Sequence, residues 1–179
     1  KASLDPLTGL LNHAAARKRM EERLSSHEES KFAFIIFDLD YFKLANDTYG
    51  HKFGDDVLIY IAETLRSVLR KEDLAVRIGG DEFLIILEYH EDIEPVADRI
   101  FQILKGNYEH FPISISMGIS MTENNIREYD TLFKRADKAL YAAKRGGRGR
   151  YVFYDDMMDN MFSVLSPIEG AEEDKRGLV

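Results

Sequence analysis

The sequence has no cysteine, which excludes disulfide bonds, thiolate metal sites and a cysteine nucleophile. It also lacks an apolar run near the roughly 18 to 20 residues of a membrane-spanning helix, a signal peptide, an internal repeat and a low-complexity tract. Because residue 1 is Lys rather than Met, we expect a piece of a longer protein with further sequence upstream. The lack of cysteine fits a reducing compartment, so we expect a cytoplasmic domain within a protein that could still be tethered to a membrane.

Basic residues are also fewer than acidic ones. The 24 Lys and Arg residues stand against 32 Asp and Glu, and the formal net charge is −8. This balance argues against general nucleic-acid binding, which favours basic surfaces, but it leaves room for a small phosphorylated ligand at a local basic cluster. The sequence does have 45% hydrophobic residues, including 11 Phe and 9 Tyr. That content is enough for the core of one folded domain.

Hydrophobic periodicity predicts helices and strands that interleave. Helical spacing is found at residues 14–26, 53–70, 93–104 and 131–145. Runs typical of strands stand at residues 32–37, 74–78, 83–87, 112–120 and 151–154, whereas 1–12 indicates a structured turn. This order predicts an α/β fold (an α+β sandwich) with a central mixed sheet of about five strands flanked by helices. We expect this domain to cover residues 1–154 and to be followed by an acidic C-terminal tail or linker at 155–179, with room for one extra helical turn.

Acidic residues follow the first predicted strand and fill the tip of a predicted hairpin. Asp38 and Asp40 end the apolar run FAFIIF, and Asp81 and Glu82 follow a Gly-Gly pair. Strand ends fix catalytic groups well, and two glycines let a phosphate approach the backbone closely. If Asp38 and Asp81 converge, their repulsion favours a divalent cation between them, and hard oxygen ligands select Mg²⁺. The alternatives are solvated carboxylates at a strand end and a Gly-Gly turn that is only a turn.

Basic residues occur near these acids in the sequence. Lys43 follows the first strand closely. A second group surrounds the glycine-broken end of the last predicted helix and consists of Lys144, Arg145, Arg148 and Arg150. Such a group suits a triphosphate, although Lys and Arg at a helix C-terminus also commonly stabilise the helix dipole. Both interpretations stay open on the sequence alone.

The segment NDTYGHKFGDD is too polar and too rich in glycine to be pure core. Its Asn46 offers both a donor and an acceptor, and Asp55 accepts from adjacent N–H groups. These groups suit the N1 and N2 edge of guanine. His51 in the same segment belongs to a residue type that fills turns more often than it contacts ligands.

Five motifs follow one another along the chain: DPLTGLLNH (5–13), FDLDYFKLANDTYGHKFGDDVL (37–58), RIGGDEF (77–83), SMGIS (116–120) and ADKALYAAKRGGRGR (136–150). Their order and spacing resemble the GGDEF family of diguanylate cyclases over roughly residues 4–154. The resemblance implies a fold akin to class III nucleotide cyclases and polymerase palms. It also implies that the domain condenses two GTP molecules into cyclic di-GMP and two pyrophosphates. His13 and Gly149 depart from the family pattern, where Arg and Asn are frequent.

The family pattern implies a role for each acid. Asp38, the backbone carbonyl of Leu39 and Asp81 would hold Mg²⁺ or Mn²⁺, two ions per active site. Glu82 would assist at the metal or the phosphate, and Asp81 would help to deprotonate the attacking 3′-hydroxyl. Lys43 would stabilise charge on the phosphates.

The same resemblance implies the substrate contacts. Lys144 and Arg148 would grip the far phosphates of GTP, and Asn46 and Asp55 would read the guanine edge. The substrate-binding residues of the polar segment would be Phe42, Asn46, His51 and Asp55. Because each domain would hold one GTP, catalysis would require a homodimer, under the control of an upstream sensory or regulatory domain.

Arg70 and Asp73 have the Arg-x-x-Asp form just before the Gly-Gly pair. In the family this spacing resembles an inhibitory site for the product, cyclic di-GMP. An Arg can engage guanine O6 and N7, and an Asp accepts from its N–H groups. Arg99 on the next helix would be a further contributor. The alternative is an ordinary charged helix end.

Three other functions compete with a cyclase. A GGDEF domain without catalysis would only bind GTP or cyclic di-GMP, but such domains usually have a broken motif, and Asp38, Lys43, Asp81 and Glu82 are all present. A cyclase for mixed GTP and ATP is disfavoured by Asp55, since a carboxylate repels the N1 acceptor of adenine. A purely structural dimerisation domain would not need these site residues.

Overall fold

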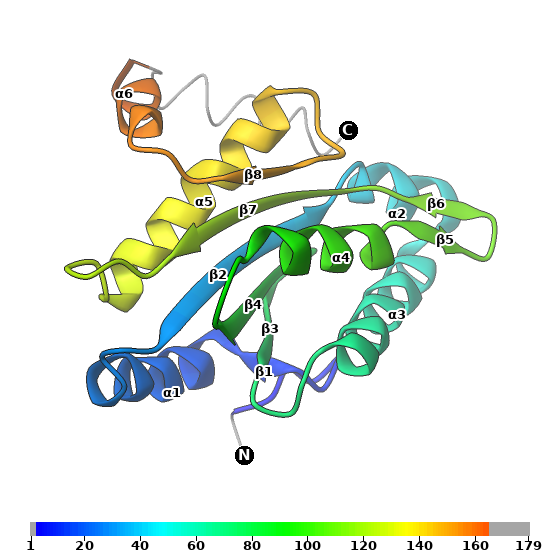
Figure 1. Ribbon diagram of the computed structural model, residues 1–179. Helices are drawn as coiled ribbons and strands as arrows, with labels where there is room; N and C mark the ends of the chain where they lie inside the picture. Colours follow the sequence, from blue (N-terminus) through cyan, green and yellow to red (C-terminus); the bar gives the residue numbers. More distant parts are fainter. Residues whose placement is uncertain (1–2, 165–179) are drawn as a thin grey trace.

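The computed structural model describes residues 3–164, and its centre is a six-stranded sheet in the order β1-β3-β4-β2-β7-β8 (Figure 1). These strands are β1 (Leu11–Asn12), β2 (Lys31–Leu39), β3 (Leu74–Gly79), β4 (Glu82–Tyr89), β7 (Ile115–Met121) and β8 (Tyr151–Phe153). Strand β2 is antiparallel to β4 and β7, and β3 is antiparallel to β4, whereas β1–β3 and β7–β8 are parallel pairs. The predicted mixed sheet is confirmed.

Helices cover both faces of this sheet. On one face lie α3 (His51–Val68) and α4 (Glu94–Leu104), and on the other lie α1 (His13–Ser26) and α5 (Tyr129–Arg145). In β2 the odd-numbered residues Ala33, Ile35 and Phe37 pack towards α3 and α4, and the even-numbered Phe32, Phe34 and Ile36 pack towards α1 and α5. Because both faces are buried, residues 32–37 of the strand are all apolar, which explains why the sequence shows a run instead of alternation.

The sheet has one strand more than the predicted number of about five. The additional strand is β1, a two-residue strand within the segment predicted as a turn. The predicted strand at 112–120 is also two strands, since β6 (Phe111–Ile113) pairs with β5 (Gly106–Tyr108) in a separate hairpin and only β7 belongs to the main sheet. The missed strands β1, β5 and β6 have only two or three residues each, too few to show a clear alternation.

A further element absent from the prediction is α2 (Phe42–Tyr49), which directly follows the end of β2. Only Ala45 of this helix is fully buried, so it has no apolar stripe that a periodicity search would find. Gly50 separates α2 from α3. The polar segment of the sequence is therefore a pair of helices beside the end of the central strand.

The predicted tail begins with a short helix, α6 (Met157–Val164). Asp159 of α6 accepts from Lys138 Nζ of α5 at 2.5 Å and from the Tyr154 hydroxyl at 2.8 Å. This part of the predicted tail thus lies against the domain, and the rest of it (165–179) is outside the described residues. The boundary at 154 stays a prediction. Among the described residues, no helix combines the length and apolarity that crossing a bilayer requires.

The start of α1 contains a partly buried histidine. Asn12 caps the helix through a hydrogen bond from Ala15 N to its Oδ1 (2.9 Å). The next residue, His13, stacks its ring on Phe133 of α5 with 4.7 Å between centroids. Burial, together with the positive charge of Arg17, lowers the pKa of the His13 imidazole from its ordinary value of 6.5, although Asp130 opposes this shift.

We expect this histidine to make folding sensitive to acid. The unfolded chain takes up a proton on His13 at a higher pH than the folded protein, so the free energy of unfolding should fall as the pH drops below 6.5. His13→Phe keeps the stacked ring and should reduce that fall. Urea unfolding at about pH 7.5 and about pH 5 measures it. The exposed His110→Gln serves as control, and a pH dependence that is the same in all three proteins would contradict the assignment.

Candidate active site

Two acids face each other where β2 ends and β4 begins. Asp38 is paired in register with Glu82, and both continue the set of side chains that points towards α5. The Asp38 side chain is almost fully buried, with 7% of the residue exposed. This burial contradicts the interpretation of Asp38 as a solvated strand-end carboxylate.

Lys144 of α5 reaches the buried acid. Its Nζ lies 2.6 Å from Asp38 Oδ2, and both side chains are largely buried. The other oxygen of the same carboxylate, Oδ1, is buried without a hydrogen-bond partner. A buried oxygen without a partner is costly, so this position favours a ligand that supplies positive charge or a donor.

Both paired acids resist ionisation. Burial raises the pKa of the Asp38 carboxyl to about 7; Lys144 opposes the shift, and the negative charge of Asp81 adds to it. Burial likewise raises the pKa of Glu82 to about 7, helped by the charges of Asp137 and Asp38. The acids of the hairpin and of β2 thus lie close enough for their charges to act on one another, and a cation shared between them stays a prediction.

Arg77 stabilises the hairpin tip that carries Asp81. Its guanidinium donates to the Gly80 carbonyl oxygen from Nε (3.0 Å) and Nη2 (2.8 Å), and its Nη1 lies 3.0 Å from Asp5 Oδ1. Asp5 in turn accepts from the Thr8 hydroxyl at 2.7 Å. The first motif of the sequence therefore supports the hairpin.

The acids are chemically suitable ligands for a divalent cation. The carboxylates and the main-chain carbonyls at a strand end are hard oxygen ligands, and Asp38 Oδ1 lacks a partner. Among residues 3–164, however, no three acidic or histidine side chains already surround a common point as a formed metal cluster would. Lys144 lies on the second oxygen of Asp38. The residues fit Mg²⁺ or Mn²⁺, and binding would require some rearrangement of Lys144.

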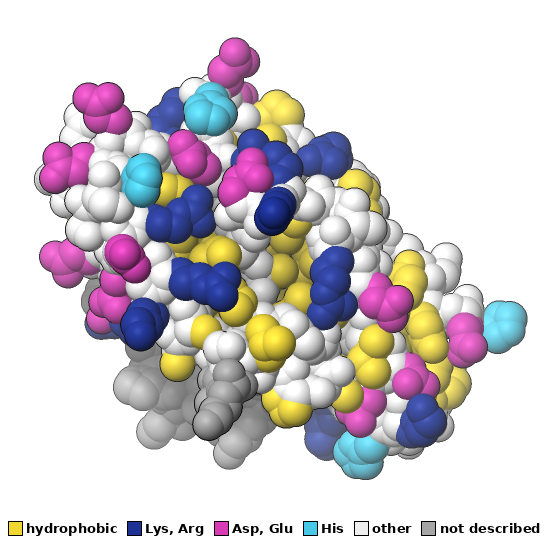
Figure 2. Space-filling model, turned by 90° about the horizontal axis from the view of Figure 1, so that it is seen from below, with side chains coloured by type: hydrophobic (Ala, Val, Ile, Leu, Met, Phe, Trp, Pro, Cys, Tyr) yellow, Lys and Arg dark blue, Asp and Glu magenta, His cyan; other side chains and the backbone are white. Residues whose placement is uncertain are grey.

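The other predicted cations border the same region. Lys43 on α2 is exposed and lies 3.7 Å from Asp47. Arg148 follows α5 and its guanidinium stands 5.7 Å from the ring centre of Tyr41, the residue between β2 and α2. The end of β2 is thus bordered by Lys43, Lys144 and Arg148 from two sides. Despite the acidic composition, Figure 2 shows Lys and Arg side chains gathered around apolar ones at the middle of one face of the molecule.

The predicted guanine-reading residues lie on the α2–α3 pair. Asn46 packs on Gly54, where an added Cβ would be 1.8 Å from Asn46 Oδ1, so only glycine allows this approach. His51 and Asp55 are exposed on the first turns of α3, one helical turn apart. Phe42 is partly buried against the core. The structure brings Asn46 beside the turn that carries Asp55.

The sequence analysis missed the role of Asp40. It is 4% exposed, and its carboxylate accepts from Ser114, Ser116 and the main chain of Gly149. The interpretation of Asp40 as a solvated carboxylate is wrong. Three serines, at 114, 116 and 120, share one side of the predicted strand at 112–120, and the first two were the signal that could have revealed a buried polar partner.

The Arg-x-x-Asp residues line a separate pocket of about 350 Å³, together with Arg99 of α4. Arg70 donates from Nη2 to the Glu88 carbonyl oxygen (2.6 Å) and to Asp73 Oδ1 (3.3 Å). The Asp73 side chain is 4% exposed, whereas that of Arg70 is 52% exposed. The three residues predicted for product inhibition are therefore brought together around one cavity, away from the acids at the end of β2.

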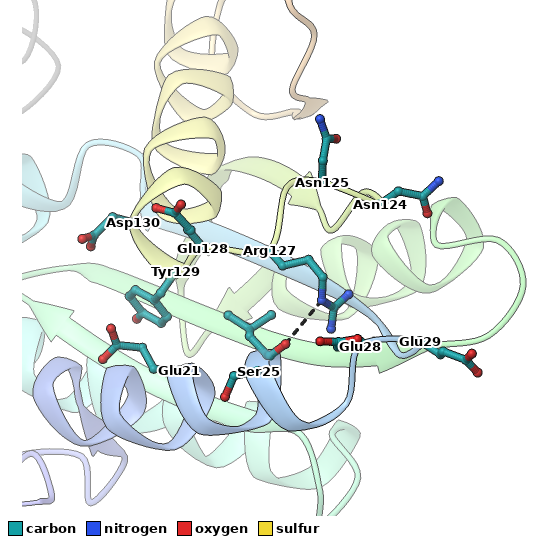
Figure 3. Close-up of a pocket in the computed structure, with 11 residues that line it drawn as sticks. Glu21, Ser25, Glu28, Glu29, Asn124, Asn125, Arg127, Glu128, Tyr129 and Asp130 are labelled. Carbon is teal, nitrogen blue, oxygen red and sulfur yellow. Dashed lines mark hydrogen bonds between the residues drawn. The ribbon is translucent and has the colours of Figure 1, made fainter.

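A larger pocket, of about 750 Å³, lies between α1 and the segment that leads into α5 (Figure 3). Arg127 crosses it and donates to the Leu24 carbonyl oxygen at 3.3 Å, the contact drawn as a dashed line. The acidic residues that line it are Glu21, Glu28, Glu29, Glu128 and Asp130. None of the predicted site residues is among the lining residues, so its size does not make it the active site.

Comparison with known proteins decides the family. The family model described as "Diguanylate cyclase, GGDEF domain" matches residues 2–150. The chain belongs to the GGDEF family. Among its curated relatives, the diguanylate cyclase DgcP of Pseudomonas aeruginosa is 40% identical over 159 residues, 84% of this chain and 24% of the relative. The cyclic di-GMP phosphodiesterase PdeR of Escherichia coli is 33% identical over 172 residues, 92% of this chain and 26% of the relative. This GGDEF domain thus spans about a quarter of these relatives.

Solved structures agree with the fold. The GGDEF domain of DgcB from Caulobacter crescentus, in complex with c-di-GMP, superposes with a TM-score of 0.74 at 32% identity, covering 86% of this chain and 93% of that one. The diguanylate cyclase SiaD of Pseudomonas aeruginosa, in complex with its activator SiaC, gives a TM-score of 0.75 at 36% identity over 85% of this chain and 62% of that one. The six-stranded mixed sheet of this domain is the GGDEF architecture.

Proposed function

We propose that this GGDEF domain is a diguanylate cyclase that condenses two GTP molecules into cyclic di-GMP. The observation that carries the proposal is the meeting of Asp38 and Glu82 at the end of β2, next to the hairpin turn with Asp81. The buried carboxyl groups and a partnerless carboxylate oxygen suit a divalent cation with phosphates attached. The diguanylate cyclase names of relatives such as DgcP support the same activity.

Asp38, the Leu39 carbonyl and Asp81 would hold two Mg²⁺ or Mn²⁺ ions, assisted by Glu82. When bound, such ions increase the nucleophilicity of a coordinated hydroxyl and neutralise phosphate charge. The 3′-oxygen of one GTP attacks the α-phosphorus of the other, the bond to the β-phosphate breaks, and pyrophosphate leaves. Asp81 accepts the proton of the 3′-hydroxyl. A second, identical step closes the ring.

The basic residues at the end of β2 position the phosphates. Lys43 offsets their charge, and Lys144 and Arg148 bind the β- and γ-phosphates from the end of α5. For this contact the Lys144 ammonium would have to leave Asp38, whose carboxylate would then be free to hold a divalent cation. Asn46 and Asp55 hydrogen bond to the guanine edge, with Phe42 and His51 beside them. Positioning and electrostatics account for most of the rate enhancement.

The reaction needs two domains that face each other, since each holds one GTP. We therefore propose a homodimer as the active form and control of its assembly by sequence outside this domain. Cyclic di-GMP would inhibit at the pocket of Arg70, Asp73 and Arg99, where guanidinium groups and a carboxylate match the guanine edges. The c-di-GMP complex of the related DgcB domain is consistent with this binding.

A product assay tests the proposal. The purified domain, alone and fused to a dimerising coiled coil, is incubated with GTP, ATP and Mg²⁺, and the products are identified by mass. We expect cyclic di-GMP from the fused dimer, little from the dilute monomer, and no mixed dinucleotide. A forced dimer that binds GTP and forms no cyclic dinucleotide would show a domain that only binds nucleotide, the main alternative.

A further inference from the structure

Asp40 lies two residues beyond the proposed metal ligand Asp38 and is almost completely buried, with 4% exposed. Its Oδ1 accepts from the Ser116 hydroxyl at 2.6 Å, and its Oδ2 accepts from the Ser114 hydroxyl at 2.6 Å. The Oδ2 atom also accepts from the backbone N–H of Gly149 at 3.0 Å. The carboxylate thus connects three parts of the chain: the end of β2, the start of β7 and the loop after α5.

The loop after α5 carries the proposed phosphate-binding cations. Lys144 lies in the last turn of the helix, and Arg148 follows it in left-handed backbone (φ 65°), as does Gly149 (φ 57°). Left-handed backbone is unfavourable for a side chain such as that of Arg, so a contact must hold this loop in place. Three contacts of Arg148 and Gly149 contribute: Arg148 N donates to the Ala143 carbonyl oxygen (3.0 Å), the Arg148 carbonyl oxygen accepts from Arg150 Nε (3.0 Å), and Gly149 N donates to Asp40.

Tyr41, the neighbour of Asp40, makes a second contact with the same loop. It also has left-handed backbone (φ 60°), and its ring lies 5.7 Å from the Arg148 guanidinium. Asp40 and Tyr41 therefore meet Gly149 and Arg148 as two adjacent pairs. The segment that leaves the metal-binding strand and the segment that carries the phosphate-binding cations have a fixed relative position.

We infer that Asp40 is a positioning residue, which sets the place of the phosphate-binding loop relative to the metal-binding end of β2. The inference rests on the proposed function, since it concerns how the β- and γ-phosphates of GTP are held. Asp40 itself does not touch the nucleotide. Its effect passes through the Gly149 backbone to Arg148 and Lys144, so it concerns the nucleotide's distal phosphates and not its guanine.

A comparison of GTP and GMP binding to the Asp40→Asn variant distinguishes a positioning role from a general loss of structure. The carboxamide keeps the shape but presents an N–H₂ group to one of three donors. We expect binding of GTP, measured by calorimetry with Ca²⁺ as a non-catalytic cation, to weaken about 10- to 100-fold. Binding of GMP, which lacks the distal phosphates, should change less than about twofold. Equal losses for GTP and GMP, or no loss for either, would overturn the inference.

Two further variants keep the test decisive. Ser114→Ala removes one donor to Asp40 without burying a mismatched amide, so it decides the case if Asp40→Asn does not fold; we expect the same GTP-specific loss, at about three- to tenfold. In the double variant Asp40→Asn, Arg148→Ala, the loss of GTP binding should be clearly smaller than the sum of the two single losses, whereas additive losses would contradict action through this loop. If the unaltered domain binds no GTP, the proposed function fails instead.

Discussion

Replacing Asp81 by Asn is expected to lower cyclic di-GMP formation by at least about 1000-fold, because a metal-held phosphoryl transfer loses several kcal/mol of transition-state stabilisation. The amide retains the size of the side chain at the hairpin tip but removes a metal ligand and the proton acceptor. Asp81 lies in the turn that Arg77 holds through Gly80, so the fold should be unaffected. Initial rates of a forced dimer at saturating GTP measure the effect.

The control for this variant is a nearby acid outside the proposed metal set. Asp47 on α2 is exposed and pairs with Lys43 at 3.7 Å, a contact of little energy. Asp47→Asn should keep the rate within a few-fold of the unaltered domain. Comparable losses in both variants, or an Asp81→Asn domain that retains a tenth of its rate, would contradict the assignment of Asp81.

The second large effect concerns inhibition by product. Arg70→Ala should raise the half-inhibitory concentration of cyclic di-GMP about 10- to 100-fold. This factor corresponds to the binding free energy of one bidentate guanine contact. The turnover without product should stay within about twofold, because the pocket of Arg70, Asp73 and Arg99 contains none of the acids at the end of β2. Progress curves with added cyclic di-GMP give both values.

Lys71 provides the matched control for Arg70. It is the next residue, is exposed, and does not line the pocket of about 350 Å³. Lys71→Ala should leave inhibition unchanged. Inhibition that is equally strong in Arg70→Ala and in Lys71→Ala would show that the product acts elsewhere, and the inhibitory assignment would then be wrong.

The sequence was sufficient for the architecture because the long elements have strong periodicity. The run FAFIIF predicted a buried strand, and β2 indeed has helices on both faces. The long helices α1, α3, α4 and α5 were predicted from their apolar spacing, and the family motifs predicted the acids that meet at the strand end. The elements that escaped prediction, such as β1 and α2, are short or have few buried positions.

The site contains features that no sequence pattern encodes. The pairing of Asp38 with Glu82 depends on the register between β2 and β4, which long-range packing sets. The same is true of the Lys144–Asp38 ion pair and of the Gly149 contact with Asp40, whose partners are more than a hundred residues apart in the chain. The family resemblance assigned Asp38, Glu82 and Lys144 to one site, whereas Asp40 and Gly149 were not assigned to it from the sequence. Their contacts come from the structure.

A titration with Mn²⁺ tests directly whether the acids of β2 and the hairpin form one cation site. The electron paramagnetic resonance signal of free Mn²⁺ measures how much of the ion is bound. The account predicts saturable binding to the unaltered domain that weakens at least about tenfold in both Asp38→Asn and Asp81→Asn. Glu28→Gln, which removes a carboxylate from the acidic pocket beside α1, should bind as the unaltered domain does. Affinities that are equal in all four proteins would contradict the account.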